Sequence, residues 1–305
     1  MQISELIKGN NDESSITKKD NYLISKHVED FTNWLDGCFN VPSSFNHGYY
    51  ILKTKQNWQC SNLYEAFENY RWPYNILCEV QSKRVSGSGF CETFDYLNIL
   101  AGSFRSAVIE NNTELARKSA LVMLTWGGVK NKNDKRILDM GDGICDYFKH
   151  VQESLNMQTC CLGNHENIFM NSGFTKLYFL LVDDFIMYDG RVGAALGLLG
   201  RMYAEEAGFE KIPPEIEFSF GSGKTSPKRQ KNGDRRNPST EKYKLPSFNG
   251  RPDRQLNDNI KACWLIKELA DKTESRFSLL PQDSPLNERM TAIQSALFMI
   301  GYDVR

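Results

Sequence analysis

The sequence predicts a mainly α-helical protein, and three observations support this fold class. Of the 305 residues, 40% are hydrophobic and 12% are aromatic, which is enough to fill a large core. From residue 96 onward, apolar residues recur at spacings of three and four, the period of an amphipathic helix. The eight cysteines are spread along the chain without the density of a disulfide scaffold. We therefore expect a helical globule with reduced, mostly buried cysteines.

Composition divides the chain into three regions. Residues 1–95 form an aromatic-rich N-terminal region, whose pattern is compatible with short strands. Residues 96–210 form a helical core, and residues 211–305 contain a basic loop followed by C-terminal helices. No internal repeat and no heptad pattern is found.

The helical core begins with two long helices and a broken one. The apolar face of the first helix consists of Leu97, Leu100, Phe104 and Val108. The second is expected over residues 113–126, with Thr113 as its cap and a pair of glycines at its end. Residues 134–155 also have a helical pattern, but Gly141 and Gly143 predict a break in its middle.

Further helices are expected in the second half of the chain. A short apolar helix over residues 175–182 precedes a turn at Asp183-Asp184 and an amphipathic helix over residues 192–206. A later helix over residues 257–272 has an apolar face made of Ile260, Trp264, Leu265 and Leu269. The last helix is expected to begin with Ser284 as its cap and a proline in its first turn.

The overall charge excludes a general attraction to polyanions. The 37 Lys and Arg residues nearly balance 38 acidic residues, so any basic surface must be local. Residues 222–244 are such a segment, with eight basic and two acidic residues, and they predict a surface loop. This loop either binds DNA phosphates or is a solvated insertion. Its candidate phosphate ligands are Lys224, Lys228, Arg229, Lys231, Arg235 and Arg236.

Several other functions lack the residues they need. Cys160, Cys161 and His165 have no second ligand pair at zinc-site spacing, so we expect neither a metal nor another cofactor. The GSGK stretch that begins at Gly221 lacks the glycine spacing of a nucleotide-binding loop. The N-terminal stretch MQISELIKGNNDESS has no basic segment followed by an apolar one, and no window approaches a membrane span. We expect a cytoplasmic protein.

Asp189 lies where an apolar run gives way to Gly190 and a helical pattern. An aspartate at this point commonly caps the helix, because the free N–H groups and the helix dipole stabilise its charged form. The same position also suits a catalytic carboxylate. Cleavage of an N-glycosidic bond builds oxocarbenium character on the sugar, which a fixed anion stabilises. In either role, Asp189 is expected to be ionised at neutral pH.

The stretch IMYDGRVGAALGLLGRMYAEEAG resembles the segment of the helix-hairpin-helix DNA glycosylases that carries their catalytic aspartate, most closely in the adenine glycosylase branch. The match is residue by residue over Asp189-Gly190-Arg191-Val192. The resemblance implies that Asp189 is catalytic and that the preceding NSGFTKLYFLL stretch forms a hairpin that grips a DNA phosphate. Lys176 falls near the position where bifunctional members carry a Schiff-base lysine. The hairpin residues implied to contact DNA are Ser172, Gly173 and Thr175.

The extensions at both ends resemble those of divergent bacterial glycosylases with an 8-oxoguanine-glycosylase-like fold. Some of these act in phage defence by excising modified bases from phage DNA. The resemblance implies a double-stranded DNA substrate with a bulky modified cytosine, such as glucosylated hydroxymethylcytosine, flipped out of the duplex. Trp126 and Tyr188 are candidate walls of the base pocket, with core packing as the alternative for each. A monomer is favoured.

Some roles stay open from the sequence. Lys176 is a candidate for covalent attack with strand cleavage, for phosphate binding or for a solvated position. Arg191 either faces the DNA backbone or pairs with Asp183 or Asp184. The alternatives to a glycosylase are a non-catalytic DNA-binding module and a nuclease or toxin. The latter would use the ICDYFKH stretch, or the Asp183-Asp184 pair with a divalent cation.

Overall fold

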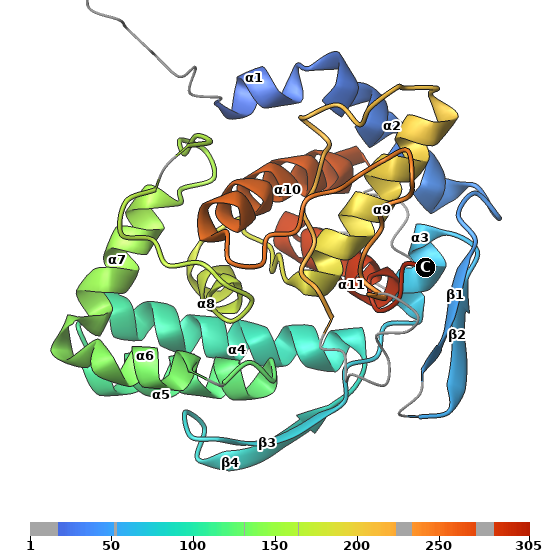
Figure 1. Cartoon of the computed structure of the whole chain (residues 1–305). Helices are drawn as coiled ribbons and strands as arrows, with labels where there is room; N and C mark the ends of the chain where they lie inside the picture. The colour runs from blue at the N-terminus through green and yellow to red at the C-terminus, as the bar shows by residue number, and fades with distance from the viewer. Residues whose placement is uncertain (1–17, 52–53, 131, 164, 224–233, 273–283) are drawn as a thin grey trace, which may run out of the picture.

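The expectation of a mainly α-helical fold is confirmed by a computed structural model that describes residues 18–51, 54–130, 132–163, 165–223, 234–272 and 284–305 (Figure 1). The helices in these ranges are α1 (Lys19–Leu23), α2 (Lys26–Asn40), α3 (Leu63–Glu68), α4 (Phe90–Ile109), α5 (Thr113–Trp126), α6 (Asn133–Asp139), α7 (Ile144–Ser154), α8 (Phe174–Leu181), α9 (Gly190–Glu206), α10 (Pro252–Lys272) and α11 (Leu286–Ile300). The strands are β1 (His47–Ile51), β2 (Gln56–Cys60), β3 (Tyr74–Cys78) and β4 (Lys83–Gly87).

The named strands lie in the aromatic N-terminal region and form two separate antiparallel hairpins. In the β1–β2 hairpin, Tyr49 is opposite Trp58, and their rings stack with centroids 4.8 Å apart. Tyr49 also stacks on Tyr302, close to the C-terminus, at 4.9 Å. These cross-strand aromatic pairs stabilise a short hairpin and attach it to the last residues of the chain.

Local signals locate most helix ends, with two corrections. The predicted break in residues 134–155 is a 3₁₀ turn, Gly141–Gly143, between α6 and α7. The cap of α5 is Asn112, whose side chain accepts a hydrogen bond from the N–H of Leu115, and not Thr113 as predicted. The predicted Ser284 cap is also wrong, because Pro285 is extended and α11 begins after it. In both helices, the N-cap residue thus lies one position away from the predicted one.

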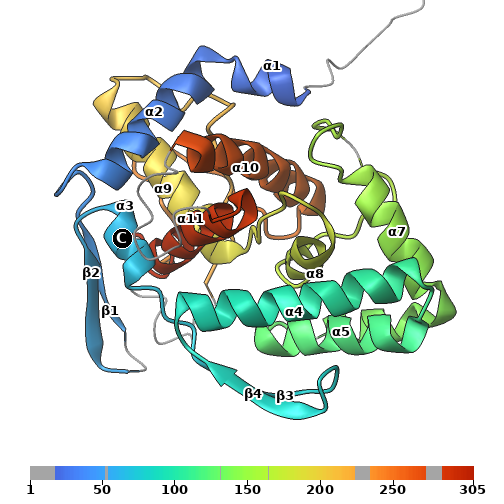
Figure 2. The ribbon, with the colours of Figure 1, turned by 180° about the vertical axis from the view of Figure 1, so that it is seen from behind.

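One hydrophobic core includes residues from all three compositional regions. Helices α4 and α5 pack on each other, and α8 packs on α4. α11 lies among α3, α9 and α10, while α10 also packs on α2, as both views show (Figures 1 and 2). The C-terminal helix is therefore a central element, and it brings residues near 300 next to residues near 190. Within the described ranges, no helix is long and apolar enough to cross a membrane.

Candidate active site

Asp189 caps helix α9. Its backbone is extended, and its Oδ1 atom accepts hydrogen bonds from the N–H groups of Arg191 (2.9 Å) and Val192 (3.4 Å). These are two of the first-turn N–H groups that have no partner within a helix. The prediction that Asp189 caps the helix is therefore confirmed, but the cap uses only one of its two oxygens.

The second oxygen of Asp189 binds Lys176. The Lys176 Nζ atom lies 2.9 Å from Asp189 Oδ2, and the two side chains are only 6% and 14% exposed. Lys176 lies in the first turn of α8, whereas Asp189 precedes α9, so the ion pair joins two helices. This burial excludes a solvated role for Lys176. Of the site residues predicted from the sequence, these two are brought into direct contact.

A glycine at the end of α5 makes room for the lysine. A Cβ atom at Gly127 would lie 2.6 Å from Cδ of Lys176, closer than nonbonded carbon atoms approach. The stem of Lys176 thus passes over the backbone of Gly127 to reach Asp189. The sequence indicated Gly127 as a helix stop, and the structure adds a second reason for a glycine there.

The charges around Asp189 hold its carboxylate in the ionised form. Burial by itself raises the pKa, but the combined effect of Lys176, Arg236 and Arg191 outweighs burial, so that the pKa is about 2. Asp189 is therefore an anion at neutral pH, as expected from its position. A carboxylate of such low pKa is a weak proton acceptor, and it is better suited to stabilise a neighbouring positive charge.

Arg191 is held by aromatic rings. Its guanidinium carbon lies 4.2 Å from the ring centroid of Phe298, 4.9 Å from that of Tyr302 and 5.8 Å from that of Trp72. Burial lowers the pKa of Arg191 to about 10, although Asp189 raises it. Stacking on aromatic faces fixes the guanidinium without using up its charge.

The alternative in which Arg191 pairs with the Asp183-Asp184 turn is wrong. Asp183 binds Arg105 at 2.6 Å, and Asp184 binds Lys267 at 2.5 Å. These two ion pairs lie after the C-terminal end of α8, whereas Arg191 lies in the first turn of α9.

Two arginines of the basic segment, residues 222–244, lie close to Asp189 and Arg191. Arg235 lies over the ring of Tyr302, 4.2 Å from its centroid, and Arg236 is close enough to Asp189 for the carboxylate to raise its pKa, although burial lowers it overall. The Nε atom of Arg236 is buried and has no hydrogen-bond partner in the part of the chain that the structure describes. Lys224, Lys228, Arg229 and Lys231 lie outside the described residues.

The second half of that segment is a loop, as predicted, but it is not solvated throughout. Tyr243 is 4% exposed, and its hydroxyl donates to the carbonyl of Phe209 at 2.6 Å. Asp234 accepts hydrogen bonds from the N–H groups of Gly223 and Arg236, which fixes the turn that carries the two arginines. Tyrosine packing and this aspartate turn order a stretch whose composition indicated a solvated loop.

The site carries more positive than negative charge. Lys176, Arg191 and Arg236 surround one carboxylate, Asp189, and Arg235 is adjacent. Among the described residues, the three arginines make no ion pair with a side-chain carboxylate within 4 Å. Uncompensated, partly buried arginines are typical of sites that bind phosphate or another anion.

A small cavity of about 40 Å³ lies beside the Lys176–Asp189 pair. Its other lining residues are Tyr70, Trp72, Trp126, Gly127, Met187, Val192, Gln294, Ser295 and Phe298. The buried Nε1 atom of Trp126 has no hydrogen-bond partner among the described residues. The volume is enough for about two or three water molecules and is too small for a nucleobase. Trp126 lines this cavity, and its predicted role as a wall of a base pocket stays a prediction.

Sequence reasoning missed the other aromatic walls of this cavity. Tyr70 and Trp72 come from the loop before β3, and Phe298 comes from the last turn of α11. Nothing in their local sequence separates them from core residues, because all three belong to aromatic or apolar stretches.

Two predicted site residues are buried elsewhere. Tyr188 is fully buried and does not line the cavity; its hydroxyl donates to the carbonyl of Ser219. Thr175 is also fully buried, donates to the side chain of Asn259 at 2.7 Å and accepts from the N–H of Tyr188 at 2.9 Å. Their predicted roles as a pocket wall and a DNA ligand are wrong in this structure, because core packing takes both side chains.

In the hairpin that was predicted to grip a phosphate, the backbone N–H groups already donate hydrogen bonds within the protein. Asn171 accepts hydrogen bonds from the N–H groups of Gly173 (2.7 Å) and Phe174 (3.0 Å). The N–H groups of Thr175 and Lys176 donate to backbone carbonyls. Gly173 therefore has no free N–H for a phosphate, contrary to prediction, while Ser172 stays partly exposed. Asn171, a residue type preferred at helix caps, is the sequence signal that indicated this arrangement.

Comparison with known proteins does not assign this chain to a family. No family model, no curated protein and no solved structure matches the chain. Within the described ranges, no group of three His, Cys, Asp or Glu side chains is arranged to hold a metal ion. His165 is instead hydrogen-bonded to the carbonyl of Cys161 at 3.0 Å.

Proposed function

We propose that this chain is a DNA N-glycosylase that acts at Asp189. The observation that carries the proposal is the buried Lys176–Asp189 ion pair, which lies beside an aromatic cavity and near three arginines that make no ion pair with a carboxylate of the described residues. Such a site combines a fixed anion, for a developing oxocarbenium charge, with cations for a phosphate. The Asp189-Gly190-Arg191-Val192 resemblance to helix-hairpin-helix glycosylases supports the same reaction.

In the proposed reaction, Asp189 stabilises positive charge on the deoxyribose as the bond to the base breaks. Its low pKa makes this role more favourable than proton abstraction from water. The bonding electrons leave with the base, and water adds to the sugar carbon and loses a proton, which leaves an abasic site. Arg191, Arg235 and Arg236 bind a phosphate of the extruded nucleotide.

Lys176 supports a second route. Once the ammonium has lost its proton, the amine would attack C1′ of the deoxyribose, and the base would leave with the electrons of the broken glycosidic bond. The nitrogen then loses a proton and the sugar ring opens, its ring oxygen taking up a proton, which gives a covalent imine. Elimination of the 3′ phosphate from this imine cuts the strand. In the structure, the ammonium is bound to Asp189, so attack requires that this ion pair opens. Without that opening, Lys176 acts as a positioning residue for Asp189.

Binding of a base requires the aromatic wall to move. The cavity volume of about 40 Å³ holds water but not a base, and Trp72 and Phe298 are its partly buried walls. We propose that DNA binding displaces these rings, and that the extruded base replaces their contacts. A bulky modified cytosine, such as glucosylated hydroxymethylcytosine in phage DNA, is the proposed target.

The test is base release from duplexes that contain uracil, 8-oxoguanine, hydroxymethylcytosine or glucosylated hydroxymethylcytosine. We compare the wild type with Asp189→Asn and with Asp146→Asn, a matched control at an exposed aspartate in the first turn of α7. The proposal predicts release that is lost in Asp189→Asn and retained in Asp146→Asn. Borohydride trapping of Lys176 on the DNA distinguishes the covalent route from simple hydrolysis.

Other results identify the alternatives. DNA binding without base release from any duplex would leave a binding module in which Asp189 is only a helix cap. Metal-dependent strand cutting that is lost in Asp146→Asn would favour a nuclease that uses the ICDYFKH stretch.

A further inference from the structure

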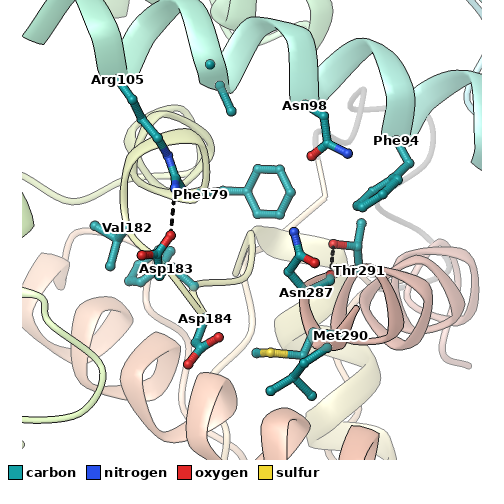
Figure 3. A pocket seen from close by; sticks show the side chains of 14 residues that line it. Phe94, Asn98, Arg105, Phe179, Val182, Asp183, Asp184, Asn287, Met290 and Thr291 are labelled. Atoms are coloured by element: carbon teal, nitrogen blue, oxygen red, sulfur yellow. Dashed lines mark hydrogen bonds and ion pairs between the residues drawn. The ribbon is translucent and has the colours of Figure 1, made fainter. Parts of the chain in front are cut away.

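A second cavity, of about 570 Å³, lies between α4, α8 and α11 (Figure 3). It shares no lining residue with the cavity at Asp189. Its volume is within the range of about 300–1,000 Å³ that is typical of small-molecule sites. The cavity is therefore large enough for a ligand that the closed cavity at Asp189 cannot hold.

Two asparagine side chains provide its polar groups. Asn98 projects from α4 and Asn287 from α11, toward the space between these helices (Figure 3). Both residues are exposed, and neither amide has a hydrogen-bond partner in the part of the chain that the structure describes. Each amide offers a carbonyl acceptor beside an NH₂ donor, the pattern that pairs with the edge of a nucleobase.

Aromatic and thioether side chains form the apolar surface of this cavity. Phe94 is 7% exposed and Met290 is 2% exposed, while the ring of Phe179 is only partly buried and lines the same cavity as the two asparagines (Figure 3). A flat aromatic ligand can stack on such a ring, as bases do on aromatic side chains.

The charged residues at this cavity do not favour a phosphate. Its lining contains one cation, Arg105, and two carboxylates, Asp183 and Asp184. The guanidinium of Arg105 is already bound to Asp183 at 2.6 Å and to the carbonyl of Leu180 at 2.8 Å. Asp184 is likewise bound to Lys267 at 2.5 Å, so the described lining residues include no unpaired cation for a phosphate, whereas the carboxylate oxygens accept hydrogen bonds from sugar hydroxyls.

We propose that this cavity binds a neutral nucleobase or nucleoside. The base edge pairs with the amides of Asn98 and Asn287, the ring stacks on Phe179, and a sugar faces the carboxylates of the rim. This inference does not depend on the proposed glycosylase activity. The two cavities do, however, follow each other along α11, because Thr291 lines the larger one and Gln294 the smaller one. A base bound here is thus close to the site where bases are proposed to be released.

The test is isothermal titration of the full chain with adenosine, guanosine, cytidine and uridine, with the four corresponding monophosphates and ribose as reference ligands. At least one nucleoside is expected to bind with 1:1 stoichiometry, more tightly than its monophosphate, and ribose is not expected to bind. Asn98→Ala and Asn287→Ala should each weaken binding about threefold to tenfold, the equivalent of one hydrogen bond. The double variant should weaken it further.

A matched variant keeps the test specific. Asn57→Ala removes an exposed asparagine on β2, away from this cavity, so it should bind the nucleoside as the wild type does. Absence of binding by all four nucleosides, tighter binding of the monophosphate, or unchanged affinity in the double asparagine variant would each overturn the proposal. Nucleoside binding by a protein that releases no base would leave this inference standing and refute only the glycosylase.

Discussion

The Lys176–Asp189 ion pair should contribute measurably to stability, and a double-mutant cycle tests this. The variants are Lys176→Met, Asp189→Asn and the combination of both. At 2.9 Å, two unit charges in an effective dielectric of about 20 attract each other by about 6 kcal/mol before the cost of removing them from water. That cost is several kcal/mol for buried charges. We therefore expect a coupling free energy of about 2–4 kcal/mol.

The pKa of Asp189 gives an independent magnitude. Its fall from the ordinary value of 3.8 to about 2 corresponds to about 2 kcal/mol in favour of the ionised form, after burial has been counted against it. This figure includes Arg236 and Arg191 as well as Lys176. It agrees with the lower end of the expected coupling.

The two single variants should differ. Lys176→Met leaves Asp189 with two helix N–H groups and two nearby arginines, whereas Asp189→Asn leaves the Lys176 ammonium buried among positive charges. We expect Asp189→Asn to cost more, about 3–5 kcal/mol, the usual result of stranding one charge of a buried pair. The second substitution should then recover part of that loss.

The assay is urea unfolding at pH 7 for the wild type and the three variants. A parallel cycle on the exposed Glu114–Lys118 pair, whose side chains are 74% and 43% exposed, is the control, and its coupling should be about 0.5 kcal/mol or less. A coupling below about 0.5 kcal/mol at Lys176–Asp189 as well, or a larger loss for Lys176→Met than for Asp189→Asn, would refute this reasoning.

Three further outcomes follow from the same structure. Because folding lowers the pKa of Asp189, the ionised carboxylate contributes to the free energy of unfolding above about pH 4, and this contribution is lost as the pH falls toward 2. Urea unfolding over this pH range should show the wild type losing about 2 kcal/mol more stability than Asp189→Asn. A Cβ at Gly301 would lie 1.8 Å from the carbonyl oxygen of Arg191, so Gly301→Ala should lower the free energy of unfolding, measured by thermal denaturation, by about 3 kcal/mol. A Cβ at Gly37 would have nothing within 4 Å, so the control Gly37→Ala should raise the free energy of unfolding by up to about 1 kcal/mol. If Arg235 binds one DNA phosphate, Arg235→Ala should reduce the slope of log affinity against log salt by about 0.9, and an unchanged slope would remove Arg235 from the DNA-binding surface.

From residue 96 onward, the sequence by itself determined most of the helices and the position of Asp189, whereas the helices of the aromatic N-terminal region were not predicted. Helical periodicity, caps and glycine breaks act over a few residues, so the break at Gly141–Gly143 and the start of α9 are locally encoded. The role of Asp189 as a helix cap is equally local, because both N–H partners lie within three residues of it.

Only the tertiary structure decided which neighbours of Asp189 belong to the site. Adjacent side chains on extended backbone point in opposite directions, so Tyr188 enters the core while Asp189 faces Lys176. Adjacent residues on α8 are also about 100° apart, which buries Thr175 against Asn259 and turns Lys176 to the site. Local sequence patterns do not distinguish between these faces.

The cavity walls and the arginines illustrate the same limit over longer distances. Trp72, Phe298 and Arg236 are far apart in the chain, and they meet at Asp189 because α11 packs against α3 and α9. Composition assigned residues 222–244 to a solvated loop, since charge counts do not show where Tyr243 is buried. Local patterns specify a helix and its ends, whereas the site depends on which helix faces are buried together, and that is a property of the packed core.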